Sequence, residues 1–335
     1  MKRSIALSAL LAAALGAAPL AFAQQAQVTS MRLPAPDVSP SLRSMAESLA
    51  ATSSARQVVP LRLVTPAMRN QLPQSALRGA APATALQTGP SGVTPQVYTG
   101  GTLVNVDGIP SNMTVAPPDP VGAVGETQYV QWVNNRLAVF DKASGAMILG
   151  PLPGNALFAG MSGSPGADAC RESNFGDPIV VYDKLAKRWL LTQFGWDPDN
   201  TATGPYYQCI AVSTSPDATG SYYRYSWDIR NSGGQIVFPD YPKVGVWPDA
   251  FYFTWVLFEN PINGGYLGPR ACGVDRAVML AGGAPLARCY DFGTAYGPVL
   301  PADLDGTMAP PAGSPNYMLS LDFGADGTGD HLFMW

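Results

Sequence analysis

A pattern that recurs about every 60 residues constrains this chain more than any other feature of its sequence. An Asp-Pro or Asp-x-Pro step opens a short β-branched or aromatic run at Asp119, Asp177 and Asp240, and Asp303 follows Pro301. The spacings between these aspartates are 58, 63 and 63 residues. Repeats of that size, each with several short strands, are typical of the blades of a β-propeller. The period therefore predicts an all-β propeller fold.

Each repeat divides into four expected strands separated by turn residues. In the second repeat, the apolar runs 179–182 and 189–194 flank the polar stretch 183–188, which is the pattern of a hairpin. The expected strands are 121–124, 129–133, 136–140 and 146–149, then 179–182, 189–194, 207–213 and 222–227, then 243–246, 251–257, 272–280 and 288–292, and finally 317–322 and 331–335. This is about three and a half blades of four strands.

The last repeat has only two expected strands, and the sequence ends on the apolar run Phe333-Met334-Trp335. A propeller protects its strand edges by closing its ring. We therefore expect the propeller to be incomplete at the C-terminus and the sequence to come from a longer protein.

The first residues have the three parts of an export signal. Lys2 and Arg3 are followed by an apolar run over 5–20 and by the small-x-small site Ala-Phe-Ala at 21–23. We expect residues 1–23 to be removed, which places the mature protein in the periplasm or outside the cell. No later stretch approaches the ~20 apolar residues of a membrane span, so we expect no membrane insertion after cleavage.

Residues 24–95 differ in composition from the rest of the chain. They are rich in Ala, Pro, Gln and Ser and almost lack aromatic residues, so we expect a disordered linker or pro-segment. One helix is predicted over 41–51, where Leu42, Met45 and Leu49 share a face. The propeller domain is expected over 96–335.

The low charge of the chain disfavours some classes of binding partner. Only 13% of the residues are charged, against ~25% in ordinary domains, and the net charge is −4. Without a basic patch, nucleic acid and anionic membrane surfaces are poor partners.

Four cysteines in an exported protein predict disulfides. Three pairings are open, and we favour the pairs within one repeat, Cys170–Cys209 and Cys272–Cys289, each contributing ~3 kcal/mol. The chain has no Cys-x-x-Cys motif and only one histidine, His331, so no Cys/His metal site and no Ser-His-Asp hydrolase is predicted.

Carboxylates are the strongest candidates for chemistry. The first strand of each blade lines the channel of a propeller, so we expect Asp119, Asp177 and Asp240, together with Asp303, to surround one mouth. Clustered carboxylates raise the pKa of at least one member and separate an acid from a base, as a glycosidase requires. Such a cluster can also hold calcium; no other cofactor is expected. The alternative is that each Asp only caps a turn before a strand that begins with Pro.

Aromatic residues give a second set of candidates. Those within strands are expected to pack between blades, whereas Trp196, in Gly-Trp-Asp-Pro-Asp-Asn, is the best candidate for an exposed ring that binds a ligand. Asp303 and Asp305 are further binding candidates.

Several segments resemble a family of exported bacterial β-propellers. They are Pro-Pro-Asp-Pro-Val-Gly-Ala-Val-Gly at 117–125, Gly-Asp-Pro-Ile-Val at 176–180, Gln-Cys-Ile-Ala-Val-Ser at 208–213, Asp-Tyr-Pro-Lys at 240–243 and Leu-Pro-Ala-Asp-Leu-Asp-Gly at 300–306. The resemblance spans roughly 100–335 and implies the fold and export, without an activity. More distantly, the Asp-Pro openings are similar to those of arabinanase and sialidase-type glycosidase propellers.

The sequence therefore supports two hypotheses for the function. The first is a recognition module for a glycan or for a cell-surface or matrix protein, and the alternative is a glycoside hydrolase that uses the ring of aspartates. A glutamate near the mouth, such as Glu126 or Glu172, would favour the enzyme, and a channel filled with apolar side chains would favour the module. Since no complete catalytic signature is present, the module is the first expectation, and the sequence leaves open whether the protein is an enzyme.

Overall fold

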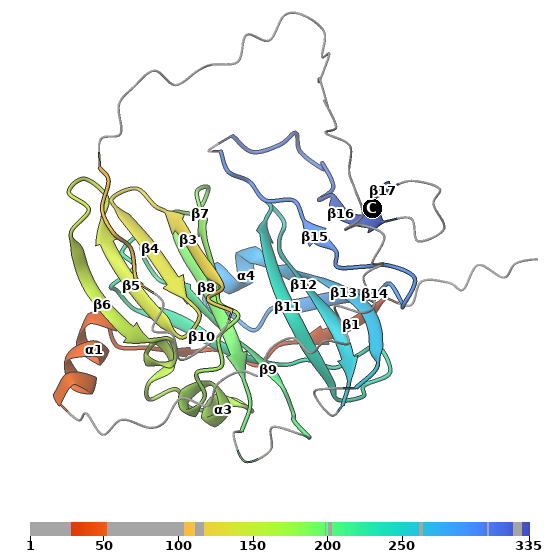
Figure 1. Cartoon of the computed structure of the whole chain (residues 1–335), viewed down its shortest axis with the longest axis horizontal. Helices are drawn as coiled ribbons and strands as arrows, with labels where there is room; N and C mark the ends of the chain where they lie inside the picture. The colour runs from red at the N-terminus through yellow and green to blue at the C-terminus, as the bar shows by residue number, and fades with distance from the viewer. Residues whose placement is uncertain are drawn as a thin grey trace, which may run out of the picture.

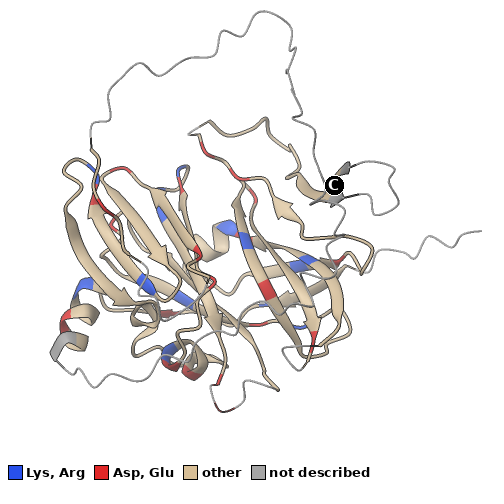
Figure 2. Cartoon of the chain, in the orientation of Figure 1, with Lys and Arg blue, Asp and Glu red and all other residues tan. Residues whose placement is uncertain are grey.

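The computed structural model describes residues 28–51, 104–110, 117–197, 199, 203–260, 264–306, 308–323 and 330–335. The expected export signal and most of the expected linker lie outside these residues. The described part is all-β, as predicted, with antiparallel strands in four sheets and short helices at their edges (Figure 1). Charged residues are sparse on the strands, in agreement with the composition (Figure 2).

The sheets follow the repeats of the sequence. The first contains β3 (Pro120–Val124), β4 (Gln128–Val133), β5 (Arg136–Asp141) and β6 (Met147–Pro153). The second contains β7 (Ile179–Asp183), β8 (Arg188–Gly195), β9 (Tyr207–Ser213) and β10 (Tyr222–Asp228). The third contains β11 (Val237–Val246), β12 (Ala250–Glu259), β13 (Tyr266–Asp275) and β14 (Leu286–Asp291), and the fourth β15 (Leu300–Pro301), β16 (Met318–Phe323) and β17 (Asp330–Met334).

The first strands of successive sheets are neighbours in space. Strand β3 contacts β7, β7 contacts β11, and β11 contacts β15, so these strands lie at the centre of the fold (Figure 1). This arrangement of successive antiparallel sheets is consistent with a propeller-like fold. It also brings residues about 60 positions apart in the sequence to equivalent places.

Three strand predictions need correction. The stretch expected as a strand over 272–280 is the end of β13 followed by helix α4 (Arg276–Leu280), which begins where the Asp275 carboxylate accepts a hydrogen bond from the Val278 backbone N–H. Strand β11 starts at Val237, well before the expected Lys243, and its pairing with β12 is irregular between Asp240 and Lys243. The short strand β15 was missed.

The expectation of a linker is wrong for residues 28–51. Strand β1 (Thr29–Arg32) pairs with β14, and β2 (Asp37–Val38) pairs with β10, so each extends the outer edge of a sheet. Helix α1 (Leu42–Ala51), which the spacing of Leu42 and Met45 predicts, buries both of these side chains. This segment has too few apolar groups for a core of its own, but it needs none because it adds to existing sheets and covers their edges.

A buried ion pair fixes this N-terminal segment. Arg224 on β10 is 1% exposed, and its guanidinium donates to both carboxylate oxygens of Asp37, at 2.9 and 2.6 Å. Two parallel hydrogen bonds of this kind hold both planar groups in one orientation. Strand β2 is thereby tied to the second sheet by side chains as well as by its ladder.

Aromatic and aliphatic side chains fill the space between neighbouring sheets. Between the second and third sheets, Trp227 packs edge-on against Phe253 and Trp255, with ring centroids 5.7 and 5.1 Å apart. Trp132 and Trp189 are fully buried in the cluster between the first and second sheets. The expectation that strand aromatics form the core between units is confirmed.

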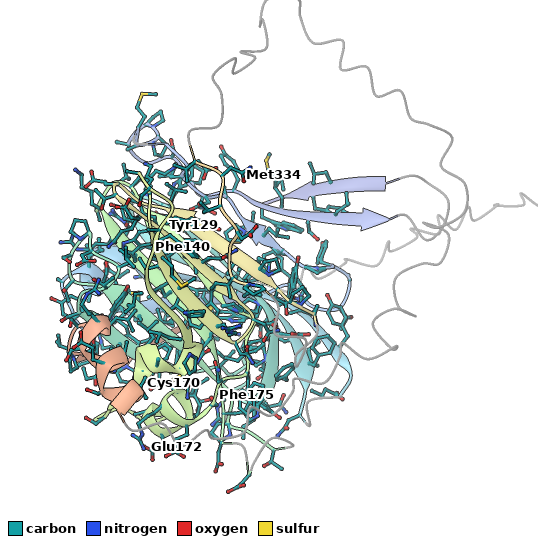
Figure 3. All side chains as sticks on the ribbon, turned by 60° about the vertical axis from the view of Figure 1, so that its left-hand side comes forward. Tyr129, Phe140, Cys170, Glu172, Phe175 and Met334 are labelled. Carbon is teal, nitrogen blue, oxygen red and sulfur yellow. A yellow bond between two sulfur atoms is a disulfide. The ribbon has the colours of Figure 1, made fainter. Side chains whose placement is uncertain are left out.

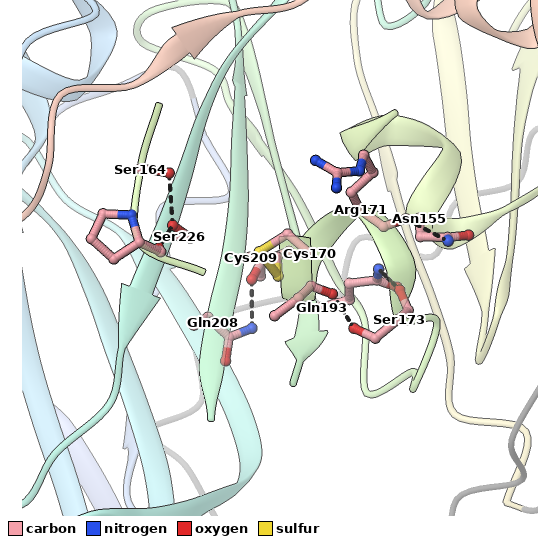
Figure 4. The surroundings of a disulfide bond; sticks show 12 residues. Asn155, Ser164, Cys170, Arg171, Ser173, Gln193, Gln208, Cys209 and Ser226 are labelled. Atoms are coloured by element: carbon pink, nitrogen blue, oxygen red, sulfur yellow. Dashed lines mark hydrogen bonds between the residues drawn. A yellow bond between two sulfur atoms is a disulfide. The ribbon is translucent and has the colours of Figure 1, made fainter. Parts of the chain in front are cut away.

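Both expected disulfides are present. Cys170 lies on helix α3 (Ala167–Glu172) and is bonded to Cys209 on β9, next to the hydrogen bond from Gln193 to the Ser173 carbonyl (Figure 4). Cys272 and Cys289 face each other directly on β13 and β14, with Cα atoms 4.0 Å apart. A further short helix, η2 (Gly154–Phe158), lies near α3.

The hairpin of β16 and β17 presents an uncovered apolar face, which we call the apolar ladder. Leu319 is paired with Met334 and Leu321 with Leu332, and all four side chains are exposed. Figure 3 shows this hairpin, with Met334 labelled, extending from the rest of the fold. Adjacent exposed apolar pairs form a contiguous patch, which is uncommon on isolated soluble domains.

We expect the apolar ladder to bind a hydrophobic dye. Changing Leu321 and Leu332 together to threonine should remove most of the dye fluorescence at an unchanged circular dichroism spectrum, because threonine is more polar than leucine and is favoured in strands. Met147→Thr, at a separate exposed apolar position, is the control and should retain the signal. Equal fluorescence from both variants would show that the dye binds elsewhere.

Within the described ranges, no helix is both long enough and apolar enough to span a membrane.

Candidate functional site

Three of the predicted aspartates approach one another at one end of the central strands. Asp119 precedes β3, Asp177 lies just before β7, and Asp240 lies in the first part of β11. Asp119 and Asp240 are close enough to raise the pKa of Asp177 by charge repulsion. Lys243 on β11 interacts electrostatically with all three carboxylates. We call Asp119, Asp177, Asp240 and Lys243 the carboxylate cluster.

Unusual backbone conformations mark this end of the strands. Asp119, Asp177 and Tyr241 have φ angles of 38°, 45° and 52°, and each directly precedes a proline. A non-glycine residue in this region costs roughly 1–3 kcal/mol, and a following proline restricts it further. In the third repeat, therefore, Tyr241 occupies the backbone position that Asp119 and Asp177 have in the first two repeats, and Asp240 lies one residue before it.

Hydrogen-bond donors from the same repeat and from a neighbouring repeat hold the carboxylates. Asn134 Nδ2 donates to Asp119 Oδ2 at 3.1 Å and to the Pro117 carbonyl at 2.7 Å. The Tyr241 backbone N–H donates to Asp240 Oδ1 at 2.9 Å and also interacts with the Asp177 carboxylate. The Tyr241 amide therefore connects the second and third repeats, which an aspartate that only caps its own turn would not require.

Lys243 lies among these carboxylates without touching one of them. Its Nζ donates to the Pro242 carbonyl at 2.9 Å and lies 3.5 Å from the centre of the Tyr241 ring. Of the ion pairs formed by described residues, none involves a member of the carboxylate cluster. The four charges act on each other through space, and all four side chains are half-buried and reached by solvent.

Burial and mutual repulsion set the protonation of the cluster. Burial, reinforced by the charges of Asp240 and Asp119, raises the pKa of Asp177 to about 7. Burial also raises the pKa of Asp119 and of Asp240, and it lowers the pKa of Lys243 against the opposing pull of the three carboxylates. At neutral pH, Asp177 can therefore either donate or accept a proton.

Asn134 is a site residue that the sequence interpretation missed, because Asn134-Asn135 looks like an ordinary turn. Its φ of 45° fits that turn, but its side chain is 4% exposed and reaches the cluster. Its Oδ1 has no hydrogen-bond partner, and a Cβ atom at Gly176 would lie 2.2 Å from it. An acceptor oxygen thus points at the backbone directly before Asp177.

Asp303 and Asp305 lie at the other end of the central strands, contrary to expectation. Asp303 Oδ1 accepts a hydrogen bond from the backbone N–H of Val246, the last residue of β11, at 2.7 Å. The Asp305 carbonyl accepts from Lys184, which follows the last residue of β7. The reason is local: Asp303 comes after its strand, β15, whereas Asp119 and Asp177 come before theirs.

Trp196 is buried, so the prediction of an exposed ring is wrong. It is 2% exposed and stacks on Phe175 with ring centroids 3.8 Å apart, and Phe238 lies edge-on to it at 5.9 Å. Phe175 is two residues before Asp177, and Phe238 is two residues before Asp240. The indole therefore packs beneath both aspartate segments and helps to position them.

The two glutamates considered as partners of the aspartates lie elsewhere. Glu126 is in the turn after β3, at the end away from Asp119, and pairs with Lys187 at 2.6 Å. Glu172, on α3, lies 3.3 Å from Arg171 (Figure 3). Any acid and base pair in the cluster must therefore come from the aspartates themselves.

The cluster does not have the form of a metal site. Over the described ranges of the chain, no three His, Cys, Asp or Glu residues are placed to hold a metal ion together. The calcium considered from the sequence thus has no set of three acidic ligands among these residues.

Comparisons with known proteins give little further information. No family model and no curated protein matches the chain. A solved structure, the exo-1,5-α-L-arabinanase from a bovine ruminal metagenomic library, is 12% identical and covers 64% of this chain and 91% of its own, with a TM-score of 0.24. A TM-score of this size assigns neither a fold nor an activity.

Proposed function

We propose that this chain is an exported β-propeller that binds a glycan at the carboxylate cluster. The observation that carries the proposal is the approach of Asp119, Asp177 and Asp240 from three successive repeats to one half-buried place. Carboxylates and a lysine at such a place can accept and donate hydrogen bonds to sugar hydroxyls. Two disulfides fit an oxidising compartment, in line with the export signal proposed over 1–23.

The backbone supports this proposal independently of the charges. Strained conformations persist only where the surrounding structure holds them, and they gather at functional sites. Here Asp119 and Asp177, which belong to the cluster, and Tyr241, which lies between Asp240 and Lys243 at positions 240–243, all have strained backbones. Aspartates that only cap turns can do so in ordinary turn conformations, without strained backbones.

Hydrolysis of the bound glycan is the second candidate, and one specific observation favours it. The pKa of Asp177 is raised to about 7 between two other carboxylates, which is suited to a general acid that donates a proton to a leaving oxygen. Asp119 or Asp240 would then act as base or nucleophile. The rate on this hypothesis falls as the pH rises through about 7, because Asp177 loses the proton that it must donate.

Screening the mature protein on a glycan array, followed by product analysis of each bound glycan, tests the proposal. We expect at least one glycan class to bind and Asp177→Asn to weaken that binding at least 10-fold, since loss of a hydrogen-bonded charge contributes ~1.5–3 kcal/mol. Asp305→Asn, at the far end of the strands, is the matched control and should bind normally. Binding that survives Asp177→Asn would place the glycan site elsewhere, and no binding on the array would reject the proposal.

A further inference from the structure

We propose that the glycan held at the carboxylate cluster carries a protonated amine, so that the ligand class is an amino sugar. The proposal rests on the function proposed above and names the chemistry of its ligand. Three features of the cluster carry it: its charge balance, the lack of direct ion pairs, and an unpartnered acceptor beside it.

The charge balance disfavours an anionic sugar. The cluster brings three carboxylates together with the single ammonium group of Lys243. The buried arginines of the described fold are already paired with Asp37, Asp183 and Asp291. A uronate or sulfated sugar would therefore add negative charge to a place that holds an excess of it, and like charges at short range repel strongly.

Because none of the three carboxylates has a direct ion pair within the described part of the chain, a cation from a ligand would stabilise their ionised forms. A half-buried carboxylate is stabilised by a direct, hydrogen-bonded cation, and without one burial disfavours its ionised form. Lys243 does not supply that contact, because its ammonium is turned to the Pro242 carbonyl and the Tyr241 ring. A second ammonium group, brought by the ligand, would relieve the repulsion that Asp177 experiences from Asp119 and Asp240.

The unpartnered acceptor adds to the negative potential that an ammonium group meets at the cluster, and because it is buried against Gly176 it acts through space and not by direct contact. Asn134 Oδ1 is buried and without a hydrogen-bond partner, and it lies against Gly176, between the segments that carry Asp119 and Asp177. Carboxylates and an amide oxygen are all acceptors, whereas an ammonium group has three donors and no acceptor. A sugar hydroxyl offers only one donor, so the acceptor-rich surroundings match an amine better than a neutral sugar.

The ring of Tyr241 adds a surface on which such a sugar can lie. The side chain is 44% exposed while its backbone amide holds the Asp177 and Asp240 carboxylates. Aromatic faces attract both sugar C–H groups and cations, and Lys243 already lies over this ring.

Titration calorimetry with three tetrasaccharides of matched length tests the inference: a glucosamine tetramer, its N-acetylated form and a galacturonate tetramer. All are measured at about pH 7, where the Asp177 carboxyl is half ionised. We expect the glucosamine tetramer to bind at least 10-fold more tightly than the acetylated form and the galacturonate tetramer to bind most weakly. Asp177→Asn should reduce the preference for the free amine at least 5-fold, and Asp305→Asn should leave it unchanged.

The outcomes separate the two proposals. Equal affinity for the free and acetylated amines, or preference for galacturonate, would overturn the amine inference while glycan binding stands. Preference for glucosamine that persists in Asp177→Asn would assign the amine to another surface and also overturn the inference. Failure of all three tetramers and of the glycan array to bind would reject glycan recognition itself.

Discussion

Replacing Asp37 by alanine is expected to lower the free energy of unfolding by about 3–5 kcal/mol. The change leaves the guanidinium of Arg224, which is 1% exposed, without its carboxylate partner in the interior. Two donors that now bond Asp37 at 2.9 and 2.6 Å would lose their acceptors, and only the hydrogen bond to the Ala159 carbonyl at 2.7 Å remains strong. Equilibrium unfolding in denaturant measures the loss.

A second ion pair, at the end of the same strand, provides the control. Asp228 and Arg230 are paired at 2.8 Å, but both side chains are about one-third exposed. Solvent can hydrate either partner when the other is removed, so Asp228→Ala should cost less than about 1 kcal/mol. If Asp37→Ala is as mild as Asp228→Ala, the N-terminal segment is not held to the second sheet in the way described.

Replacing Asp177 by asparagine is expected to change function and stability in opposite directions. If the bound glycan is hydrolysed, turnover should fall by about 100-fold or more, because asparagine cannot transfer the proton. The fold should meanwhile become more stable above neutral pH. The pKa of Asp177 is about 7 in the folded protein, well above its usual value, so its contribution to stability is complete at low pH and is lost as the pH rises through about 7.

The asparagine variant has no carboxyl at position 177, so its stability does not fall as the pH rises through about 7. Its free energy of unfolding relative to the native protein should therefore increase between about pH 4 and pH 7 and stay constant above, with a gain of about 1 kcal/mol after allowance for solvent screening of a half-buried group. Unfolding curves of both proteins at several pH values measure it. A variant that is less stable at pH 8 than the native protein would mean that the Asp177 carboxylate is a stabilising turn cap.

The strands and their grouping could be predicted because their signals are local. Alternating apolar residues and polar turns set strands such as β8 and β9, and the recurring Asp-Pro steps indicated which strands come first in each sheet. The same period placed Asp119, Asp177 and Asp240 together. Both disulfides followed from pairing cysteines within one repeat.

The errors came from features that only the folded chain decides. Trp196 begins a polar loop sequence, but it directly follows β8 and its indole stacks on Phe175. Residues 28–51 lack a core of their own and still fold, because they add strands to sheets made by residues far along the chain. Asp303 has the right spacing but follows its strand, which moves it to the opposite end.

The proposed function requires Asp119, Asp177 and Asp240, from successive repeats, to form one electrostatically coupled ligand site. Nuclear magnetic resonance of the aspartate carboxyl carbons, followed as a function of pH with and without the glycan, tests it most directly. We expect one carboxyl, absent from the Asp177→Asn spectrum, to titrate at about 7, and its titration to shift when glycan is added. If the Asp177 carboxyl titrates near the ordinary value of ~4 and its titration does not change when glycan is added, the three aspartates do not form a coupled glycan site.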